Sequence, residues 1–103
     1  MSTKTQMKPL PKWFNGDVYP KGGTVKNIFT GEPAVLNANE LSMYDFIMGA
    51  TMILERTGYR SEKIMNDHRR GLDWFRGANA SAYMVLLDSV SYTHLTLPTI
   101  LLV

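Results

Sequence analysis

The residue best suited to chemistry in this sequence is His68, which directly follows Asp67. An imidazole can act as a general base or bind a metal. A base needs a nucleophile or substrate within hydrogen-bond reach, and a metal needs further ligands. His68 instead stands between Ile64 and Leu72 on an apolar stripe with helical spacing. We therefore interpret His68 as a hydrogen-bonded core residue, not as a catalytic group or a metal ligand.

Other residue types that carry catalysis are missing or poorly spaced. The chain contains no cysteine, which excludes disulfides, thiolate zinc sites and a cysteine nucleophile. Asp67, Asp73 and Asp88 are too scattered to predict a pair of catalytic carboxylates. The stretch Lys21-Gly22-Gly23 lacks the Gly-Lys-Ser/Thr sequence of a phosphate-binding loop. We predict no catalytic residue, no metal ligand and no cofactor, and hence a protein that is not an enzyme.

A long helix is predicted in the middle of the chain. Asn37 followed by Glu40 matches a capping box, in which each residue satisfies a backbone N–H of the other. Apolar residues then recur at helical spacing from Ala38 to Thr57. Gly58 suits the left-handed residue that commonly ends a helix. The helix is apolar over much of its circumference, so we expect it to lie in the core.

Two further helices are predicted after it. Ser61 is expected to cap a second helix that ends at Gly77, and Asn79 to cap a third that runs to the end of the domain. Gly71 inside the second helix predicts either a close approach of two helices or a break, and Gly49 in the first helix predicts a close approach as well. In the third helix, one buried face is expected to contain Ala80, Tyr83, Met84 and Leu87.

A short β-hairpin is predicted before the helices. Val25 and Ile28 on one side, and residues 34–36 on the other, flank the turn sequence Thr30-Gly31-Glu32-Pro33. Pro33 is tolerated at the turn or at the start of a strand, where its missing N–H costs little. The predicted fold class is therefore α+β, a small helix-dominated domain with about three helices and one N-terminal β-hairpin.

The pattern of composition divides the chain into three parts. Residues 1–11 are rich in lysine, proline and small polar residues, and we expect a disordered basic arm. Residues 12–88 are predicted to form a single small domain, truncated at its C-terminus. Residues 89–103 form a tail without acidic residues, lysine or arginine, which we interpret as non-native.

The interpretation of the tail rests on its back-translation. The codons for residues 90–99 resemble a transposon end joined to an adapter arm of a sequencing library. An adapter would continue through an index sequence and reach a stop codon directly after Val103, where this sequence ends. The alternative is a genuine terminal β-strand, since Tyr92, Leu95 and Leu97 favour extended structure.

Residues 24–88, taken together, resemble a group of small proteins. The stretches "KNIFTGEPAVLNANELSMYDFIMGA" and "RRGLDWFRGANASAYMVLLD", within residues 24–88, are similar to small uncharacterised proteins of tailed phages and metagenomic bacteria. The resemblance implies no activity, and no functional residue follows from it.

The remaining features favour a protein that binds other macromolecules. The N-terminus lacks the apolar core of a signal peptide, and no apolar run reaches the roughly 20 residues that span a membrane, so we expect a cytoplasmic protein with no membrane contact. Our preferred hypothesis is a non-enzymatic phage or bacterial accessory protein that acts through protein–protein contacts. Trp13 and Phe14 are the candidate contacts, whereas Trp74 and Tyr83 are interpreted as core residues. The sequence predicts no oligomeric state.

Two alternatives remain open. The net charge is +2, and lysines dominate the region before Asn27, which favours weak, sequence-independent binding to nucleic acid. The candidate contacts are Lys4, Lys8, Lys12, Lys21, Lys26, Arg69 and Arg70. The second alternative is that the chain is the N-terminal fragment of a larger protein.

Overall fold

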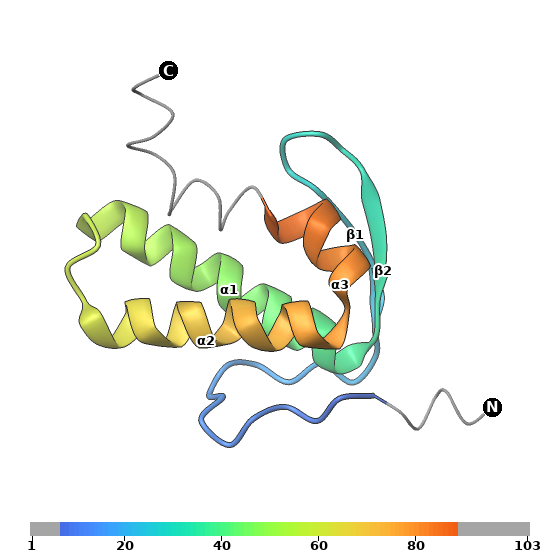
Figure 1. The fold of residues 1–103 in the computed structure, drawn as a ribbon, viewed down its shortest axis with the longest axis horizontal. Coiled ribbons are helices and arrows are strands. Elements are labelled where there is room, and N and C mark those ends of the chain that lie inside the picture. Colours follow the sequence, from blue (N-terminus) through green and yellow to red (C-terminus); the bar gives the residue numbers. More distant parts are fainter. Residues whose placement is uncertain (1–6, 89–103) are drawn as a thin grey trace.

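The computed structural model describes residues 7–88. Lys4, the first part of the predicted basic arm and the whole tail at 89–103 lie outside the described residues, so the two interpretations of the tail stay predictions. Three helices and a two-stranded antiparallel hairpin form the described part, and the predicted α+β fold class is confirmed (Figure 1). In chain order the elements are β1 (Gly23–Lys26), β2 (Pro33–Leu36), α1 (Ala38–Thr57), α2 (Glu62–Ala78), α3 (Ala80–Ala82) and the π-helical turn η2 (Tyr83–Leu87).

The caps predicted for α1 are confirmed. The Glu40 N–H donates to Asn37 Oδ1 at 2.8 Å, and the Asn37 N–H donates to Glu40 Oε1 at 3.0 Å, which completes the capping box. Gly58 ends the helix in the left-handed conformation with φ of 76°. Local side-chain hydrogen bonds therefore determine where this helix begins, and a residue without a Cβ determines where it ends.

The second helix also follows its predicted cap, with one difference at its end. Ser61 Oγ accepts from the Ile64 N–H at 3.2 Å, as expected of an N-cap. The helix passes through Gly77 and ends at Ala78, because Asn79 rather than glycine supplies the cap: its side chain accepts from the Ala82 N–H and so begins α3. Asn79 thus separates two helices that are otherwise continuous.

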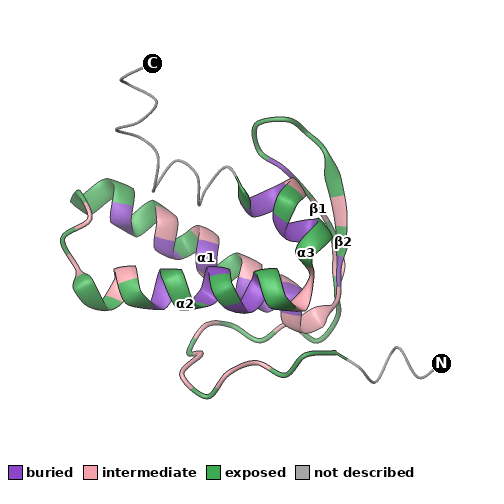
Figure 2. Cartoon of the chain, viewed as in Figure 1, coloured by how far each residue is buried: buried purple, intermediate pink, exposed green. Residues whose placement is uncertain are grey.

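The helices α1 and α2 lie side by side and supply most of the core (Figures 1 and 2). Met43, Ile47 and Leu54 of α1 and Phe75 of α2 are fully buried. Gly71 lies where the two helices approach, since a Cβ there would be 3.0 Å from Ile47 Cγ1. The helix is continuous at this position, so the close-approach interpretation of Gly71 is confirmed.

His68 is part of this core. It is 3 % exposed, and its Nε2 lies 2.8 Å from Thr51 Oγ1. The Thr51 hydroxyl donates its single proton to the Ile47 carbonyl oxygen, so it accepts from the His68 Nε2–H. The interpretation of His68 as a hydrogen-bonded core residue is therefore confirmed.

The buried face predicted for the third helix is wrong in part. Tyr83 and Leu87 are buried as expected, but Ala80 is exposed and Met84 is 63 % exposed, whereas Ala82 and Leu86 are buried. Residues 83–87 form a π-helical turn, in which the Asp88 N–H bonds to the Tyr83 carbonyl oxygen five residues earlier. The buried residues Ala82, Tyr83, Leu86 and Leu87 form two pairs four residues apart, so the inward face has helical spacing but is turned away from the predicted face.

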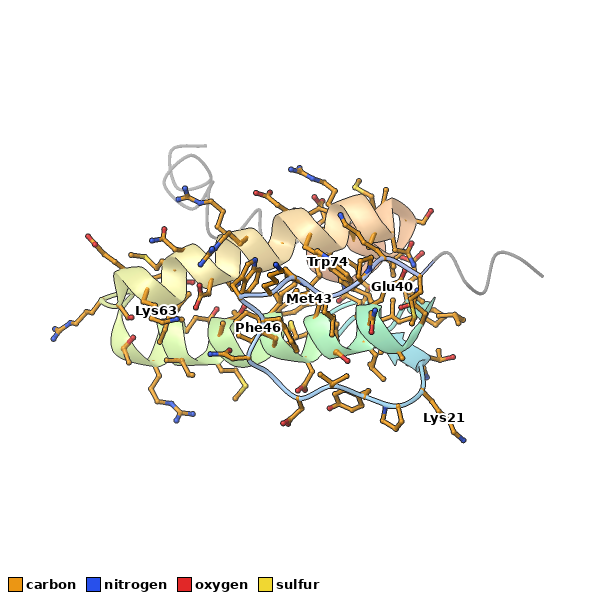
Figure 3. The ribbon with its side chains drawn as sticks, turned by 90° about the horizontal axis from the view of Figure 1, so that it is seen from below. Lys21, Glu40, Met43, Phe46, Lys63 and Trp74 are labelled. Atoms are coloured by element: carbon orange, nitrogen blue, oxygen red, sulfur yellow. The ribbon has the colours of Figure 1, made fainter. Side chains whose placement is uncertain are left out.

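The segment before the hairpin is fixed to both helices. Trp74 Nε1 donates to the Pro9 carbonyl oxygen at 3.0 Å, and Asn39 Nδ2 donates to the Lys8 carbonyl oxygen at 2.9 Å. Residues 8 and 9, which we expected in a disordered arm, are thus held by hydrogen bonds to α1 and α2. Figure 3 shows this segment crossing the helix pair close to Trp74.

Among residues 7–88, no helix is long and apolar enough to cross a membrane.

Candidate functional site

The most distinctive local structure is the loop between β1 and β2, residues 27–32, which we call the hairpin loop. Asn27 organises it and is only 7 % exposed. Its Oδ1 accepts from the Phe29 N–H at 2.6 Å and from the Thr30 N–H at 3.0 Å. Its Nδ2 donates to the Val85 carbonyl oxygen of η2 at 2.7 Å. One buried side chain therefore shapes the loop and attaches it to the helical body.

The backbone of the hairpin loop is closed by further hydrogen bonds. The Asn27 N–H donates to the Glu32 carbonyl oxygen at 2.9 Å, and the Gly31 N–H donates to the Asn27 carbonyl oxygen at 2.8 Å. Gly31 has φ of 79°, a conformation that residues with a Cβ rarely adopt. The Thr30 hydroxyl accepts from the Glu32 N–H. Each backbone N–H from Phe29 to Glu32 is consequently paired inside the loop.

This ordered loop holds two large apolar side chains in solvent. Ile28 is 68 % exposed and Phe29 is 74 % exposed. Single exposed apolar residues are common on protein surfaces and need no explanation. Two adjacent exposed apolar residues at the end of a hydrogen-bonded hairpin do need an explanation. The loop cannot turn these side chains inward without breaking its own hydrogen bonds. Figure 2 shows the loop as an exposed projection beside α3.

The position of Ile28 contradicts the sequence prediction. We expected Ile28 to lie in the first strand together with Val25, but β1 ends at Lys26. The cause is Asn27, whose side chain bonds the two following backbone N–H groups and so replaces strand pairing with a local turn. The sequence contained a signal for this turn, namely an Asn followed by two apolar residues and a Thr-Gly pair.

The aromatic residues proposed as partner contacts pack within the molecule. Trp13 and Phe14 are partly buried, with ring centroids 5.8 and 5.5 Å from that of Phe46. Trp74 and Tyr83 are 8 % and 6 % exposed, which confirms that they are core residues. The structure therefore places the prominent exposed aromatic ring at Phe29, a residue that the sequence analysis did not select.

The proposed nucleic-acid contacts lie on different elements. Lys8 lies over the Trp74 ring, whereas Lys21 precedes β1 and Lys26 ends it. Figure 3 shows Lys21 pointing away from the helix pair. Lys12 and Arg69 are exposed, in the N-terminal segment and in α2 respectively. The described cations of this set therefore come from the N-terminal segment, from β1 and the residues before it, and from α2.

Arg70 forms an ion pair and a cation–π contact within the molecule. Its Nη2 donates to Asp67 Oδ1 at 2.7 Å, and its guanidinium lies 4.9 Å from the centre of the Trp13 ring. Lys63 Nζ donates to the other carboxylate oxygen of Asp67 at 2.7 Å. The hydrogen bond from Lys63 is the main reason why the pKa of Asp67 lies below its ordinary value, and Arg70 lowers it further against the opposing effect of burial.

Comparisons with known proteins leave the function open. Neither a protein-family model, nor a curated protein, nor a solved structure matches this chain. Within residues 7–88, no three His, Cys, Asp or Glu side chains are placed to hold a metal ion. The function has to be inferred from the geometry of the surface.

Proposed function

We propose that this protein is a non-enzymatic accessory protein that binds another protein through its hairpin loop. Ile28 and Phe29 enter an apolar depression on the partner. The observation that supports the proposal is that two large apolar side chains are highly exposed on a loop with an ordered backbone. These two side chains are 68 % and 74 % exposed on a loop whose backbone hydrogen bonds are already formed.

The energetics of binding favour such a loop. Burying a phenylalanine and an isoleucine side chain contributes about 1.5–3 kcal/mol each. A loop that is ordered before binding loses little conformational entropy on docking, so more of this gain appears as affinity. The Phe29 and Thr30 N–H groups are bonded to Asn27. A partner can therefore exclude water from the loop without leaving these donors unpaired.

The same observations speak against nucleic acid as the preferred partner. The hairpin loop exposes Ile28 and Phe29 and contains no lysine or arginine at residues 27–32, whereas nucleic-acid affinity depends on cations that neutralise phosphates. Arg70 is occupied by Asp67 and Trp13. We therefore expect a protein partner, and binding of nucleic acid in its place would refute the proposal.

The test is an affinity capture from a lysate of the organism or infected host that carries the gene. The bait is the full chain, and its variant is Ile28→Ser combined with Phe29→Ser. The control is Val35→Ser, because Val35 is 75 % exposed on β2 but lies outside the loop. We expect the wild type and the control to retain a specific protein that the double variant loses, with unchanged thermal unfolding in all three.

Three results would refute this function. The double variant could retain the same protein as the wild type, or no specific protein could be recovered. The retained material could also be nucleic acid that a nuclease removes and that dissociates steeply between low and physiological salt.

A further inference from the structure

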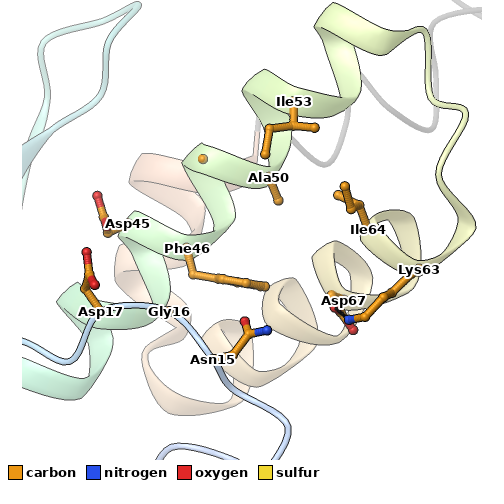
Figure 4. A pocket seen from close by; sticks show the side chains of 11 residues that line it. Asn15, Gly16, Asp17, Asp45, Phe46, Ala50, Ile53, Lys63, Ile64 and Asp67 are labelled. Atoms are coloured by element: carbon orange, nitrogen blue, oxygen red, sulfur yellow. Dashed lines mark hydrogen bonds and ion pairs between the residues drawn. The ribbon is translucent and has the colours of Figure 1, made fainter.

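A second surface feature lies between the helices and is separate from the hairpin loop. A cleft of about 420 Å³ is enclosed by α1, α2 and residues 15–17 of the N-terminal segment (Figure 4). Its size falls within the range of pockets that bind drug-sized ligands or a few side chains. It is lined by Asn15, Gly16, Asp17, Asp45, Phe46, Gly49, Ala50, Ile53, Lys63, Ile64 and Asp67.

The middle of the cleft is apolar. Figure 4 shows the Phe46 ring projecting into it from α1, with Ala50 and Ile53 farther along the same helix and Ile64 opposite on α2. Ile53 of α1 is 46 % exposed. The cleft thus offers apolar surface that the rest of the described chain leaves in contact with water.

Gly49 keeps one wall of the cleft open. A Cβ at Gly49 would meet no heavy atom within 4 Å, so the close helix approach that we predicted here is wrong. Gly71 differs from Gly49 in this respect, because side chains of α1 pack directly against it. A glycine inside a helix costs about 1 kcal/mol relative to alanine. At Gly49 no packing contact with residues 7–88 compensates for this cost, but the missing side chain leaves space in the cleft.

Charge makes the two ends of the cleft unequal. At one end the Asp67 carboxylate is neutralised by Lys63 and Arg70. At the other end lie Asp17 and Asp45, which form no ion pair with any residue from 7 to 88. Tyr19 lies in their field, and its pKa is raised above its ordinary value, mainly by the Asp45 carboxylate, then by desolvation, and then by the Asp17 carboxylate. An occupant therefore meets apolar surface beside uncompensated negative charge.

We propose that the cleft binds a segment of a partner protein in which an arginine or lysine neighbours a large apolar side chain. The apolar side chain packs on Phe46, Ala50 and Ile64, and the cation reaches Asp17 and Asp45. Complementary charge selects this occupant, since an acidic segment would be repelled. This site is independent of the proposed hairpin-loop function.

The two surfaces lie in different parts of the molecule. The hairpin crosses one end of the helix pair, whereas Ile53 and Ile64 lie toward the connection between α1 and α2 at the other end (Figure 1). The hairpin loop and the apolar part of the cleft are therefore separate surfaces.

The experiment is a titration of the isotope-labelled full chain, followed by its backbone amide resonances. The probes are two capped tetrapeptides, acetyl-Gly-Phe-Arg-Gly-amide and acetyl-Gly-Phe-Glu-Gly-amide. We expect the arginine peptide to shift the amides of Gly49, Ile53 and Ile64 and to bind at least about tenfold more tightly than the glutamate peptide. Combined Asp17→Asn and Asp45→Asn should remove most of this difference.

Two further variants locate the site. Gly49→Leu should abolish binding by filling the cleft, while Gly49→Ala shows that the helix tolerates a Cβ there. The variant with Ile28→Ser and Phe29→Ser should bind the arginine peptide as the wild type does, so this site and the hairpin-loop function succeed or fail separately.

The proposal is overturned if neither peptide binds, if both bind equally, or if folded Gly49→Leu protein still binds. It is also overturned if the cleft amides shift with protein concentration alone, because the occupant would then be a second copy of this chain.

Discussion

Replacing Asn27 with alanine is expected to destabilise the protein by about 2–3 kcal/mol and to release the hairpin loop. The Asn27 side chain makes three hydrogen bonds, to the Phe29 N–H, the Thr30 N–H and the Val85 carbonyl oxygen. Asn27 itself is 7 % exposed, so its removal leaves partners that water reaches poorly. Denaturant-induced unfolding gives the change in free energy.

Two neighbouring substitutions serve as controls for Asn27→Ala. Asn27→Asp keeps both acceptor bonds but loses the donor to Val85 and places a carboxylate beside that carbonyl oxygen, so it should also destabilise. Thr30→Ala removes only the exposed bond to the Glu32 N–H and should cost less than about 1 kcal/mol. A cost of Asn27→Ala no greater than that of Thr30→Ala would contradict the proposed role of Asn27.

Replacing Gly22 with alanine is expected to cost about 2–3 kcal/mol, the scale of a steric overlap that only a backbone shift can relieve. A Cβ at Gly22 would lie 2.7 Å from the Asn37 Cα, and closer still to the Leu36 carbonyl oxygen. These are backbone atoms at the junction of β2 and α1, so no side-chain rotation can relieve the overlap. The loss should appear as a lower denaturant midpoint.

Gly23→Ala is the matched control for Gly22→Ala. Gly23 is the next residue in the chain, and a Cβ there would meet no heavy atom within 4 Å. Alanine at this position should change the unfolding free energy by less than about 0.5 kcal/mol. Equal effects of the two substitutions would show that the chain does not pack at Gly22 as described.

The parts of the fold that were predictable depend on local signals. The start and end of α1 follow from Asn37, Glu40 and Gly58, because each acts on backbone groups within a few residues. The start of α2 follows from Ser61 in the same way. Hydrophobic spacing also placed His68 in the core, where it bonds to Thr51.

The parts that were missed depend on contacts between distant segments. Asn27 gives a local signal for a turn, but its bond to Val85, which is 58 residues away, attaches the hairpin loop to η2 and is not visible in the strand pattern. The buried face of α3 and η2 consists of Ala82, Tyr83, Leu86 and Leu87, and which side of this short segment is buried depends on the other elements of the core. The cleft forms only when residues 15–17 meet α1 and α2.

The central structural claim is that the hairpin loop is ordered while Ile28 and Phe29 remain in solvent. The most direct measurement is backbone ¹⁵N relaxation of the amides of residues 28–31 in the full chain. We expect order parameters near 0.85, equal to those of α1 and α2, as is typical of a rigid backbone. Order parameters below about 0.6 in the loop, with rigid helices, would contradict the claim that the loop is ordered before it meets a partner.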